Sequence, residues 1–265
     1  MALPKIMGIL NVTPDSFSDG GQFDSAAAAC SQAAALVASG AEIIDVGGES
    51  TRPFAEPVTE QEELQRVIPA IHAIRSSYSV PISIDTTKAE VARQALLAGA
   101  DMINDISALQ KDPGMLALVQ KTSVPVIIMH MQGTPGDMQL QPQYGNVVTD
   151  ILNFFKKRLA WLADNGVDVR RIILDPGIGF GKTLQHNLSL LKHLSEFKIL
   201  GCPLLLGHSR KRFIGDITGL EVMDRDLPTA VVAALTSSAV DIVRVHNVAA
   251  IKSALQMVSA MEQAV

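Results

Sequence analysis

A short apolar run that ends in polar residues recurs along the chain, and this repeat limits the possible folds more than any other feature of the sequence. In residues 43–53, two isoleucines, an aspartate and a valine lead into paired glycines and a polar loop. Residues 99–105 and 239–246 follow the same pattern. Short apolar runs of this kind are typical of strands covered on both faces. The repeat therefore predicts buried strands that deliver polar side chains to one end of a sheet.

The number of these units predicts the fold class. About eight strand-then-helix units fit within 265 residues, of which 48% are hydrophobic, and no change in composition marks a linker. This combination predicts an α/β fold, a TIM (β/α)8 barrel that residues 1–265 form as a single domain. Strands are expected at residues 5–10, at the start of 43–53, at 81–84, in a run ending at 105, and at 125–130, 171–174, 203–206 and 241–245.

Capping signals predict where helices begin. Ser25 is a candidate N-cap for a helix that ends at Gly40, and Thr59 with Glu62 has the spacing of a capping box. Further helices are expected to start at Pro113, to span residues 146–164 and to close the chain up to residue 261.

Charge and composition exclude several classes of partner. The formal net charge is -5, the pI is near 5.7, and no run of like charges forms a basic or acidic arm. We therefore expect no nucleic-acid partner. The sequence shows no leader segment and no apolar run of membrane-spanning length, so a cytoplasmic location without a membrane partner is expected. Cys30 and Cys202 are expected to be buried, reduced thiols.

Polar residues at the ends of the predicted strands are the candidate functional residues. In a barrel of parallel strands, the carboxyl ends of all strands lie on one face. Side chains far apart in the sequence are therefore expected to meet there. The converging set comprises Asn11, Thr51, Arg52, Asp85, Asn104, His130, Asp175, Lys211, Arg244 and His246.

One part of this set matches a flat nitrogen heterocycle. Asp85 and Asp175 can each accept a pair of N–H groups, and Asn104 can both donate and accept. Lys211 can donate to a ring carbonyl or nitrogen. The alternative for any one of the three strand-end residues is a structural one, in which it caps a helix or bonds loop amides.

The other part of the set matches an anion such as phosphate. It is rich in cations and neutral donors, although surface ion pairs are the usual alternative for arginines such as Arg52 and Arg244. Gly181-Lys182-Thr183 suggests a phosphate-binding P-loop, but Pro176 stands where the first glycine is required, which argues against one. The anion group comprises Asn11, Thr51, Arg52, Ser209, Arg244 and His246.

Taken together, the motifs of the chain resemble the dihydropteroate synthase family. The resemblance covers nearly the whole chain in the family's order, and its first two motifs are long and specific. The motifs are MGILNVTPDSFSDGG at residues 7–21, DVGGESTRP at 45–53, SIDT at 83–86, NDI at 104–106, DPGIGFGK at 175–182, SRK at 209–211 and RVH at 244–246.

The resemblance implies a folate-pathway reaction and a role for each site residue. Dihydropterin pyrophosphate and 4-aminobenzoate would give 7,8-dihydropteroate and pyrophosphate, sulfonamides would compete with aminobenzoate, and the enzyme would be a homodimer. Asn11 would bind Mg²⁺ on the pyrophosphate. Asp85, Asn104, Asp175, Phe180 and Lys211 would hold the pterin; Thr51, Arg52, Arg244 and His246 would surround the phosphates; Ser209, Asp15, Phe17 and Pro53 would complete the aminobenzoate pocket. The residues expected to take part in catalysis are Asn11, Asp15, Arg52, Arg244 and His246.

Some positions depart from the family pattern. Asn247 stands where an aspartate usually follows the RVH motif, so a charge contact near the last strand is expected to be lost. His208 precedes the SRK motif at a variable position. The segment 226–229 replaces a small-residue, glycine-containing one. These departures are expected to affect dimer packing and substrate affinity more than the reaction.

Two other functions share part of the pattern. A pterin-binding methyltransferase barrel that passes a methyl group to a corrinoid would share the Asp and Asn positions but has no need of the Thr51-Arg52 and SRK groups. A pterin-binding protein without turnover would have no reason to retain Asn11, Arg52 and Lys211 together.

Overall fold

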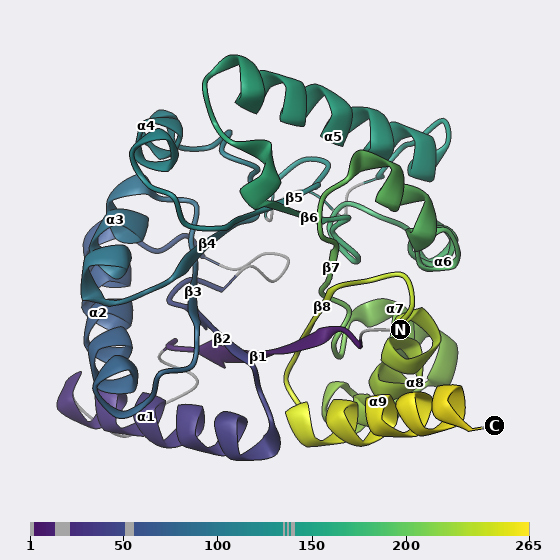
Figure 1. Cartoon of the computed structure of the whole chain (residues 1–265), viewed down its shortest axis with the longest axis horizontal. Helices are drawn as coiled ribbons and strands as arrows, with labels where there is room; N and C mark the ends of the chain where they lie inside the picture. Colours follow the sequence, from purple (N-terminus) through teal and green to yellow (C-terminus); the bar gives the residue numbers. More distant parts are fainter. Residues whose placement is uncertain are drawn as a thin grey trace.

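Eight parallel strands form the centre of the molecule in the computed structural model, which describes residues 3–13, 22–50, 56–134, 136, 138 and 141–264, without the side chains of 22–25. The strands are hydrogen-bonded in the order β6-β5-β4-β3-β2-β1-β8-β7. A parallel bridge between Leu174 and Leu204 connects β6 to β7 and closes the sheet into a barrel. The predicted (β/α)8 barrel is confirmed (Figure 1). The strands are β1 Lys5–Asn11, β2 Ile43–Gly47, β3 Ile82–Asp85, β4 Met102–Asp105, β5 Val126–Met129, β6 Ile172–Asp175, β7 Leu205–Leu206 and β8 Ile242–Val245.

Helices surround the barrel on its outer side, as Figure 1 shows. Two of them, α7 and α8, lie between β7 and β8 in the chain, where the barrel pattern requires only one. The helices are α1 Gln22–Ser39, α2 Glu60–Ser77, α3 Ala89–Ala98, α4 Pro113–Lys121, α5 Val147–Asp164, α6 Leu184–Lys192, α7 Arg212–Thr218, α8 Asp226–Thr236 and α9 Val248–Gln263.

Most predicted boundaries agree with the structure, and the exceptions have physical reasons. The capping box is confirmed, since Thr59 Oγ1 accepts from the Glu62 N–H and Glu62 accepts from the Thr59 N–H. The start at Ser25 was wrong, because α1 already begins at Gln22. The strand predicted at 203–206 is reduced to two residues, since Pro203 has no N–H and contributes only its carbonyl, which accepts from Leu174.

Side chains along each strand point alternately into the barrel and outward toward the helices. A small cluster of buried residues, one from each of seven strands, fills the interior and is distinct from the larger core outside the barrel. Successive strand residues point to opposite faces, so the residues two positions further on also point inward. The interior cluster comprises Met7, Ile43, Met102, Ile127, Ile173, Leu205 and Ile242.

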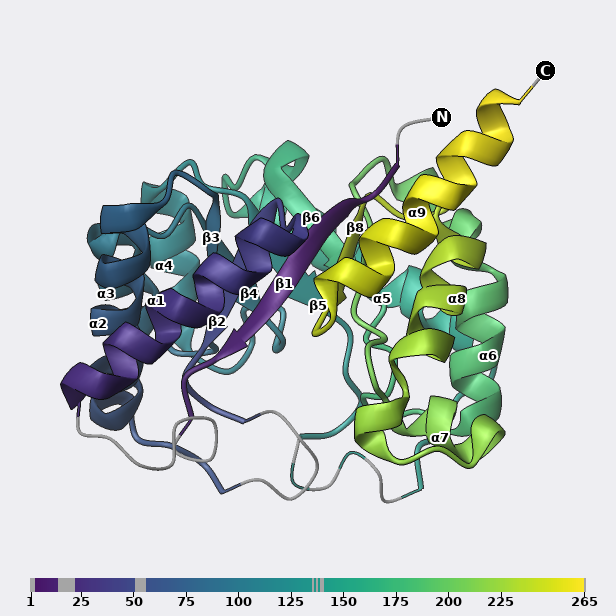
Figure 2. The ribbon, with the colours of Figure 1, turned by 90° about the horizontal axis from the view of Figure 1, so that it is seen from below.

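The next inward-facing positions, toward the carboxyl ends of the strands, are polar. They form the mouth of the barrel above the apolar interior cluster. Two residues after Ile43 comes Asp45, and two after Met102 comes Asn104. The same step leads to Asp175 in β6 and to Arg244 in β8. Figure 2 shows the barrel from the side, with α9 ending on the side where β1 starts, opposite to the mouth toward which β1 points.

Two further expectations concern the surface. The thiols of Cys30 and Cys202 are free but only partly buried, which corrects the prediction that they are buried. Among the helices of the described ranges, none is both long and apolar enough to cross a membrane.

Candidate active site

A row of neighbouring residues crosses four adjacent strands at the mouth of the barrel. In the strand register, Asn11 pairs with Gly47, Gly47 with Asp85, and Asp85 with Asn104. A methyl group built on Gly47 would lie 3.5 Å from Asp85 Cβ and 3.7 Å from Asn11 Oδ1. Because glycine carries no side chain, Asn11 and Asp85 face each other across this gap. The structure thus brings a predicted anion-group residue next to a predicted heterocycle-group residue.

A buried ion cluster lies directly behind this row. Arg244 Nε lies 2.5 Å from Asp45 Oδ2, and its Nη2 lies 2.6 Å from Asp85 Oδ2. Asn104 Nδ2 donates to the same Asp45 carboxylate at 3.2 Å. Burial opposes the charge on Arg244, but Asp45 and Asp85 outweigh it and raise the pKa of the guanidinium. Arg244, predicted among the anion binders, therefore also contacts the heterocycle group.

Asp45 was missed as a site residue by the sequence reasoning. It is fully buried and sits in the middle of β2, where a carboxylate needs a partner. The available signal was an aspartate inside an otherwise apolar strand run. Its partner, Arg244, is 199 residues away in the chain, so spacing alone did not identify it.

Asp85 carries a carboxyl group whose pKa is strongly raised. Its burial raises the pKa to about 7, and Asp45, Glu63 and Asp105 add to the effect, while Arg244 opposes it. The direct contact with Arg244 does not cancel the shift because Asp45 shares the same guanidinium. Asp85 is therefore poised to change its charge near neutral pH.

A second carboxylate and a lysine occupy the opposite side of the mouth. A methyl group built on Gly207 would lie 3.5 Å from Asp175 Oδ2 and 4.0 Å from Lys211 Nζ, so the bare glycine leaves these two groups close together. Lys211 Nζ donates to the Ile178 carbonyl and lies 4.4 Å from the centre of the Phe180 ring. Burial lowers the pKa of Lys211 to about 8 and raises that of Asp175. The predicted trio of Asp175, Phe180 and Lys211 is brought together.

Lys182 and His130 together support the loop after β6 from inside the protein. The sequence analysis did not predict that these two residues are in contact. Lys182 Nζ lies 2.9 Å from the Phe180 carbonyl and 3.2 Å from His130 Nδ1. Both side chains are buried, and burial, aided by the charge of Lys182, lowers the pKa of His130 to about 3. Lys182 thus serves the loop backbone inside the protein, which agrees with the rejection of a P-loop.

The ends of β7 and β8 are joined by a hydrogen-bonded pair. Ser209 Oγ lies 2.9 Å from His246 Nδ1, and the backbone N–H of His246 donates to Ser209 Oγ at 3.2 Å. Two predicted site residues from adjacent strands therefore form one unit.

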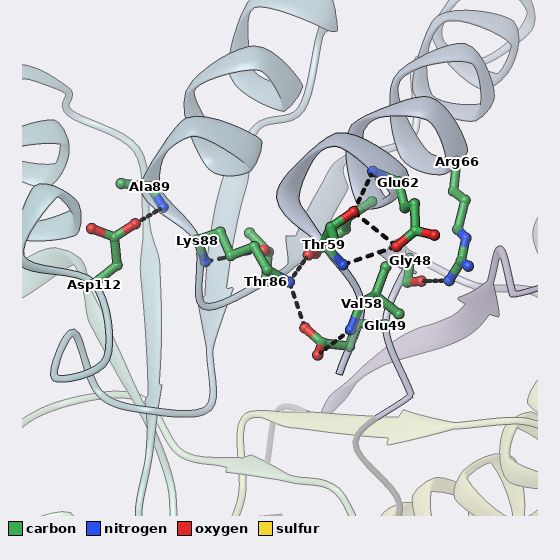
Figure 3. Close-up of polar contacts among 11 residues, drawn as sticks. Gly48, Glu49, Val58, Thr59, Glu62, Arg66, Thr86, Lys88, Ala89 and Asp112 are labelled. Carbon is green, nitrogen blue, oxygen red and sulfur yellow. Dashed lines mark hydrogen bonds and ion pairs between the residues drawn. The ribbon is translucent and has the colours of Figure 1, made fainter. Parts of the chain in front are cut away.

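The loop after β2 is held at its base by an ion triad of Lys88, Glu49 and Glu63, of which only Glu63 is fully buried. Figure 3 shows Lys88 and Glu49. Lys88 Nζ lies 2.7 Å from Glu49 Oε2 and 2.5 Å from Glu63 Oε2. The other Glu49 oxygen accepts from the Val58 N–H at 3.1 Å and so ties together the two ends of residues 50–57. Arg66 adds a bond to the Gly48 carbonyl. In the sequence, Thr51, Arg52 and Pro53 fall between Glu49 and Val58.

Five of the predicted site residues lie outside the described residues. They are Asp15, Phe17, Thr51, Arg52 and Pro53.

Comparisons with known proteins show which family the chain resembles. Residues 7–246 match the family model for pterin binding enzymes. A dihydropteroate synthase from Synechocystis is 48% identical over 97% of this chain and 89% of its own length. A Xanthomonas albilineans dihydropteroate synthase structure with 4-aminobenzoic acid has a TM-score of 0.93 at 44% identity, covering 99% of this chain and 94% of that one. A second structure from that organism, in complex with 7,8-dihydropteroate, has a TM-score of 0.90 at 41% identity, covering 99% and 95%.

The barrel and its buried polar mouth define a pterin-binding enzyme. Solved structures that resemble the chain over nearly its whole length include dihydropteroate synthases. The chain belongs to the dihydropteroate synthase family and is a transferase, which confirms the resemblance drawn from its motifs.

The ion triad at the base of the β2 loop yields the first prediction. Lys88→Met should lower the free energy of unfolding by about 3–5 kcal/mol, because it leaves the buried carboxylate of Glu63 and the half-buried one of Glu49 without a cation. Urea denaturation measures this change. Adding Glu63→Gln should recover part of the loss, since the buried charge of Glu63 is then removed.

The matched control for Lys88→Met is Arg93→Met. Arg93 pairs with Glu90 on the same helix, but both side chains are exposed, at 46% and 38%. This substitution should change the free energy of unfolding little. Equal losses for the two variants would contradict a special role of the triad.

Proposed function

We propose that the polar mouth of this barrel condenses 6-hydroxymethyl-7,8-dihydropterin pyrophosphate with 4-aminobenzoate, which gives 7,8-dihydropteroate and pyrophosphate in folate biosynthesis. The observation that carries this proposal is the set of Asp85, Asn104 and Asp175, all buried, with Lys211 close to Asp175 and Asn11 facing Asp85. The first four groups suit a pterin ring, and the last lies where a pyrophosphate on its methylene arm would extend.

The pterin is held by complementary hydrogen bonds. Asp85 and Asp175 accept N–H groups from the amino-pyrimidinone edge, and each is buried, so the bonds form away from competing water. Asn104 already donates to Asp45, which leaves its amide oxygen for a ring N–H. Lys211 donates to the ring carbonyl or a ring nitrogen, and Phe180 covers one face of the ring. The pocket thus recognises both the shape and the donor pattern of the heterocycle.

The leaving group is bound by the cations and donors at the same mouth. Thr51, Arg52, Arg244 and His246 are proposed to surround the phosphates. Arg244 keeps its charge because Asp45 and Asp85 raise its pKa. The bond between the methylene carbon and the pyrophosphate oxygen breaks, and its electron pair leaves with pyrophosphate. The cation left on carbon is delocalised into the pterin ring, near the carboxylate of Asp85.

The amine of 4-aminobenzoate then completes the reaction. Its lone pair forms the new C–N bond, and the proton it loses passes to water. An aromatic amine is already neutral at physiological pH, so neither a dedicated base nor a covalent enzyme nucleophile is required. Asp15, Phe17, Pro53 and Ser209 are proposed to line the aminobenzoate pocket and to keep water from the cation.

A magnesium ion fits the donor that the chain offers. Among the described residues, the Asn11 side chain makes no hydrogen bond, and no cluster of three or more His, Cys, Asp or Glu could hold a metal without substrate. Mg²⁺ binds oxygen ligands and commonly takes only one or two from the protein, the rest coming from phosphates and water. Asn11 would supply that ligand. The bound ion would neutralise charge on the pyrophosphate.

A direct assay separates this reaction from the two alternatives. Pyrophosphate should be released from dihydropterin pyrophosphate only when 4-aminobenzoate is present. A methyltransferase would instead transfer a methyl group from a folate, and a binding protein would retain the pterin without turnover. Release that does not depend on 4-aminobenzoate would refute the proposed reaction.

Lys211→Ala should weaken pterin binding about tenfold to a hundredfold, because a hydrogen bond from a charged donor is lost while the fold is retained. Isothermal titration with 6-hydroxymethyl-7,8-dihydropterin measures the affinity, and urea denaturation checks the fold. An unchanged affinity would remove Lys211 from the pterin site.

Pterin affinity should also depend on pH with a maximum between about 7 and 8. Protonation of Asp85, whose pKa is raised to about 7, removes an acceptor, so affinity falls as pH drops below that value, by up to about tenfold per unit. Loss of the proton from Lys211, whose pKa is lowered to about 8, removes a charged donor at higher pH. Titrations from pH 5.5 to 9 measure both limbs. Asp85→Asn should lose the acid limb, and a flat profile below pH 7 in the unmodified protein would contradict the assignment.

We also propose that the chain forms a homodimer through α8. Leu227, Val231 and Leu235 recur every four residues on this helix and are 75%, 49% and 78% exposed. Residues at this spacing lie on one helix face. An exposed apolar row of this kind suits an isologous contact with a second copy.

A cytoplasmic location without nucleic-acid partners is likewise proposed. The net charge of -5 supports the absence of nucleic-acid partners.

Leu235→Glu should convert the dimer to a monomer, because it places a charge in the apolar contact. Light scattering coupled to size-exclusion chromatography measures the mass. Leu97→Glu is the matched control, since Leu97 is 72% exposed on α3, away from α8. A monomeric unmodified protein, or two variants of the same mass as it, would refute the α8 interface.

A further inference from the structure

The residue between two site residues, Arg210, has an unusual backbone conformation. Ser209 and Lys211 flank it in the loop after β7, and its φ of 57° lies in the left-handed region that a non-glycine residue rarely adopts. Such a conformation persists only where the surroundings hold it. The orientation of Ser209 and Lys211 therefore depends on what fixes Arg210.

The start of α8 binds the guanidinium and both backbone polar groups of Arg210. Its guanidinium forms a two-pronged pair with Asp226, with Nε to Oδ1 at 2.6 Å and Nη2 to Oδ2 at 2.8 Å. Its N–H donates to Thr229 Oγ1 at 3.2 Å, and its carbonyl accepts from Arg225 Nη1 at 3.2 Å. The fork geometry restricts direction as well as distance. Neighbouring His208 adds a further contact, since its Nε2 lies 2.9 Å from the Thr229 carbonyl.

Asp226 also reaches the end of β8. Asn247 Nδ2 donates to Asp226 Oδ2 at 2.9 Å, and Asn247 Oδ1 accepts from the Ala250 N–H as the N-cap of α9. Asn247 directly follows His246, which is bonded to Ser209. Two adjacent connections, one through Ser209 and His246 and one through Asp226, thus join the loops after β7 and β8. Asn247, which carries no charge itself, thus contacts a carboxylate near the last strand, that of Asp226.

We propose that Asp226 is a positioning residue for the active site, whose carboxylate, shared by Arg210 and Asn247, sets the placement of Ser209, Lys211 and His246. This inference rests on the proposed function of those three residues. Asp226 itself touches no substrate. Arg210 lowers the pKa of Asp226, which keeps the carboxylate ionised.

The proposal can be tested by exchanging the carboxylate of Asp226 and the amide of Asn247 between the two positions. Asp226→Asn removes the charge that holds Arg210. Asn247→Asp places two carboxylates against each other where 2.9 Å now separates a donor from an acceptor. The double variant, D226N with N247D, again has one carboxylate and one amide in contact. In it, the amide at position 226 can accept from Arg210 and donate to the carboxylate at position 247.

Each single variant should raise the KM for 4-aminobenzoate and weaken pterin binding, each about tenfold or more, because small displacements of binding groups have large effects. The double variant should recover most of both losses. Steady-state pyrophosphate release and isothermal titration with 6-hydroxymethyl-7,8-dihydropterin measure the two quantities. Singles that match the unmodified protein, or a double variant no better than the combined singles, would overturn the proposal.

Asp216→Asn is the control for local charge removal. Asp216 pairs with Arg212 on neighbouring α7, where the arginine side chain is 85% exposed, and this variant should leave both KM and affinity unchanged. If Asp226→Asn does not fold, folding of the double variant is itself the expected rescue, and Asn247→Asp still tests the contact. If the unmodified protein releases no pyrophosphate, the proposed reaction fails, whereas pterin titration of the same variants still decides the role of Asp226.

Discussion

The guanidinium of Arg244 between Asp45 and Asp85 is the interaction on which the site depends. Three charged side chains inside a barrel would destabilise it if they were unpaired, since burial of a lone ion costs several kcal/mol. The ion pairs make a polar interior possible. In this cluster, the two carboxylates of Asp45 and Asp85 share the single cation of Arg244. That imbalance, together with burial, raises the pKa of Asp85 and readies it for a ligand that brings N–H donors. A partly satisfied cluster is therefore suited to binding.

The alternation of the strands made much of this arrangement predictable. Because every second residue faces inward, an apolar residue such as Ile43 implies that Asp45 and Gly47 share its face, and the end of the strand identifies the mouth. The barrel and the meeting of Asn11 with Asp85 follow from that rule. The partners of each charge did not follow, because they depend on the register between strands. Arg244 was assigned to the anion from its position after a strand, whereas the register also places it against Asp85.

The supporting contacts were the least predictable part. Lys88 and Asp226 look like ordinary loop or helix residues in the sequence, and Lys182 stands out only through an incomplete P-loop pattern. Spacing gives no sign of what these residues touch. Asp226 and Asn247 were noted separately as departures from the family pattern, yet in space they form one contact.

The loops after β2 and β7 are both anchored by an ion pair to a neighbouring helix. In the loop after β2, Lys88 joins Glu49 to Glu63 in the first turn of α2. In the loop after β7, Arg210 is joined to Asp226 at the start of α8. In both cases a carboxylate in the first turn of a helix accepts from a cation, and the helix dipole favours a negative charge at that position. The helices that follow the strands therefore cover the barrel and also orient the loops that carry its chemistry, which is why a barrel can keep its strands and change its function through such contacts.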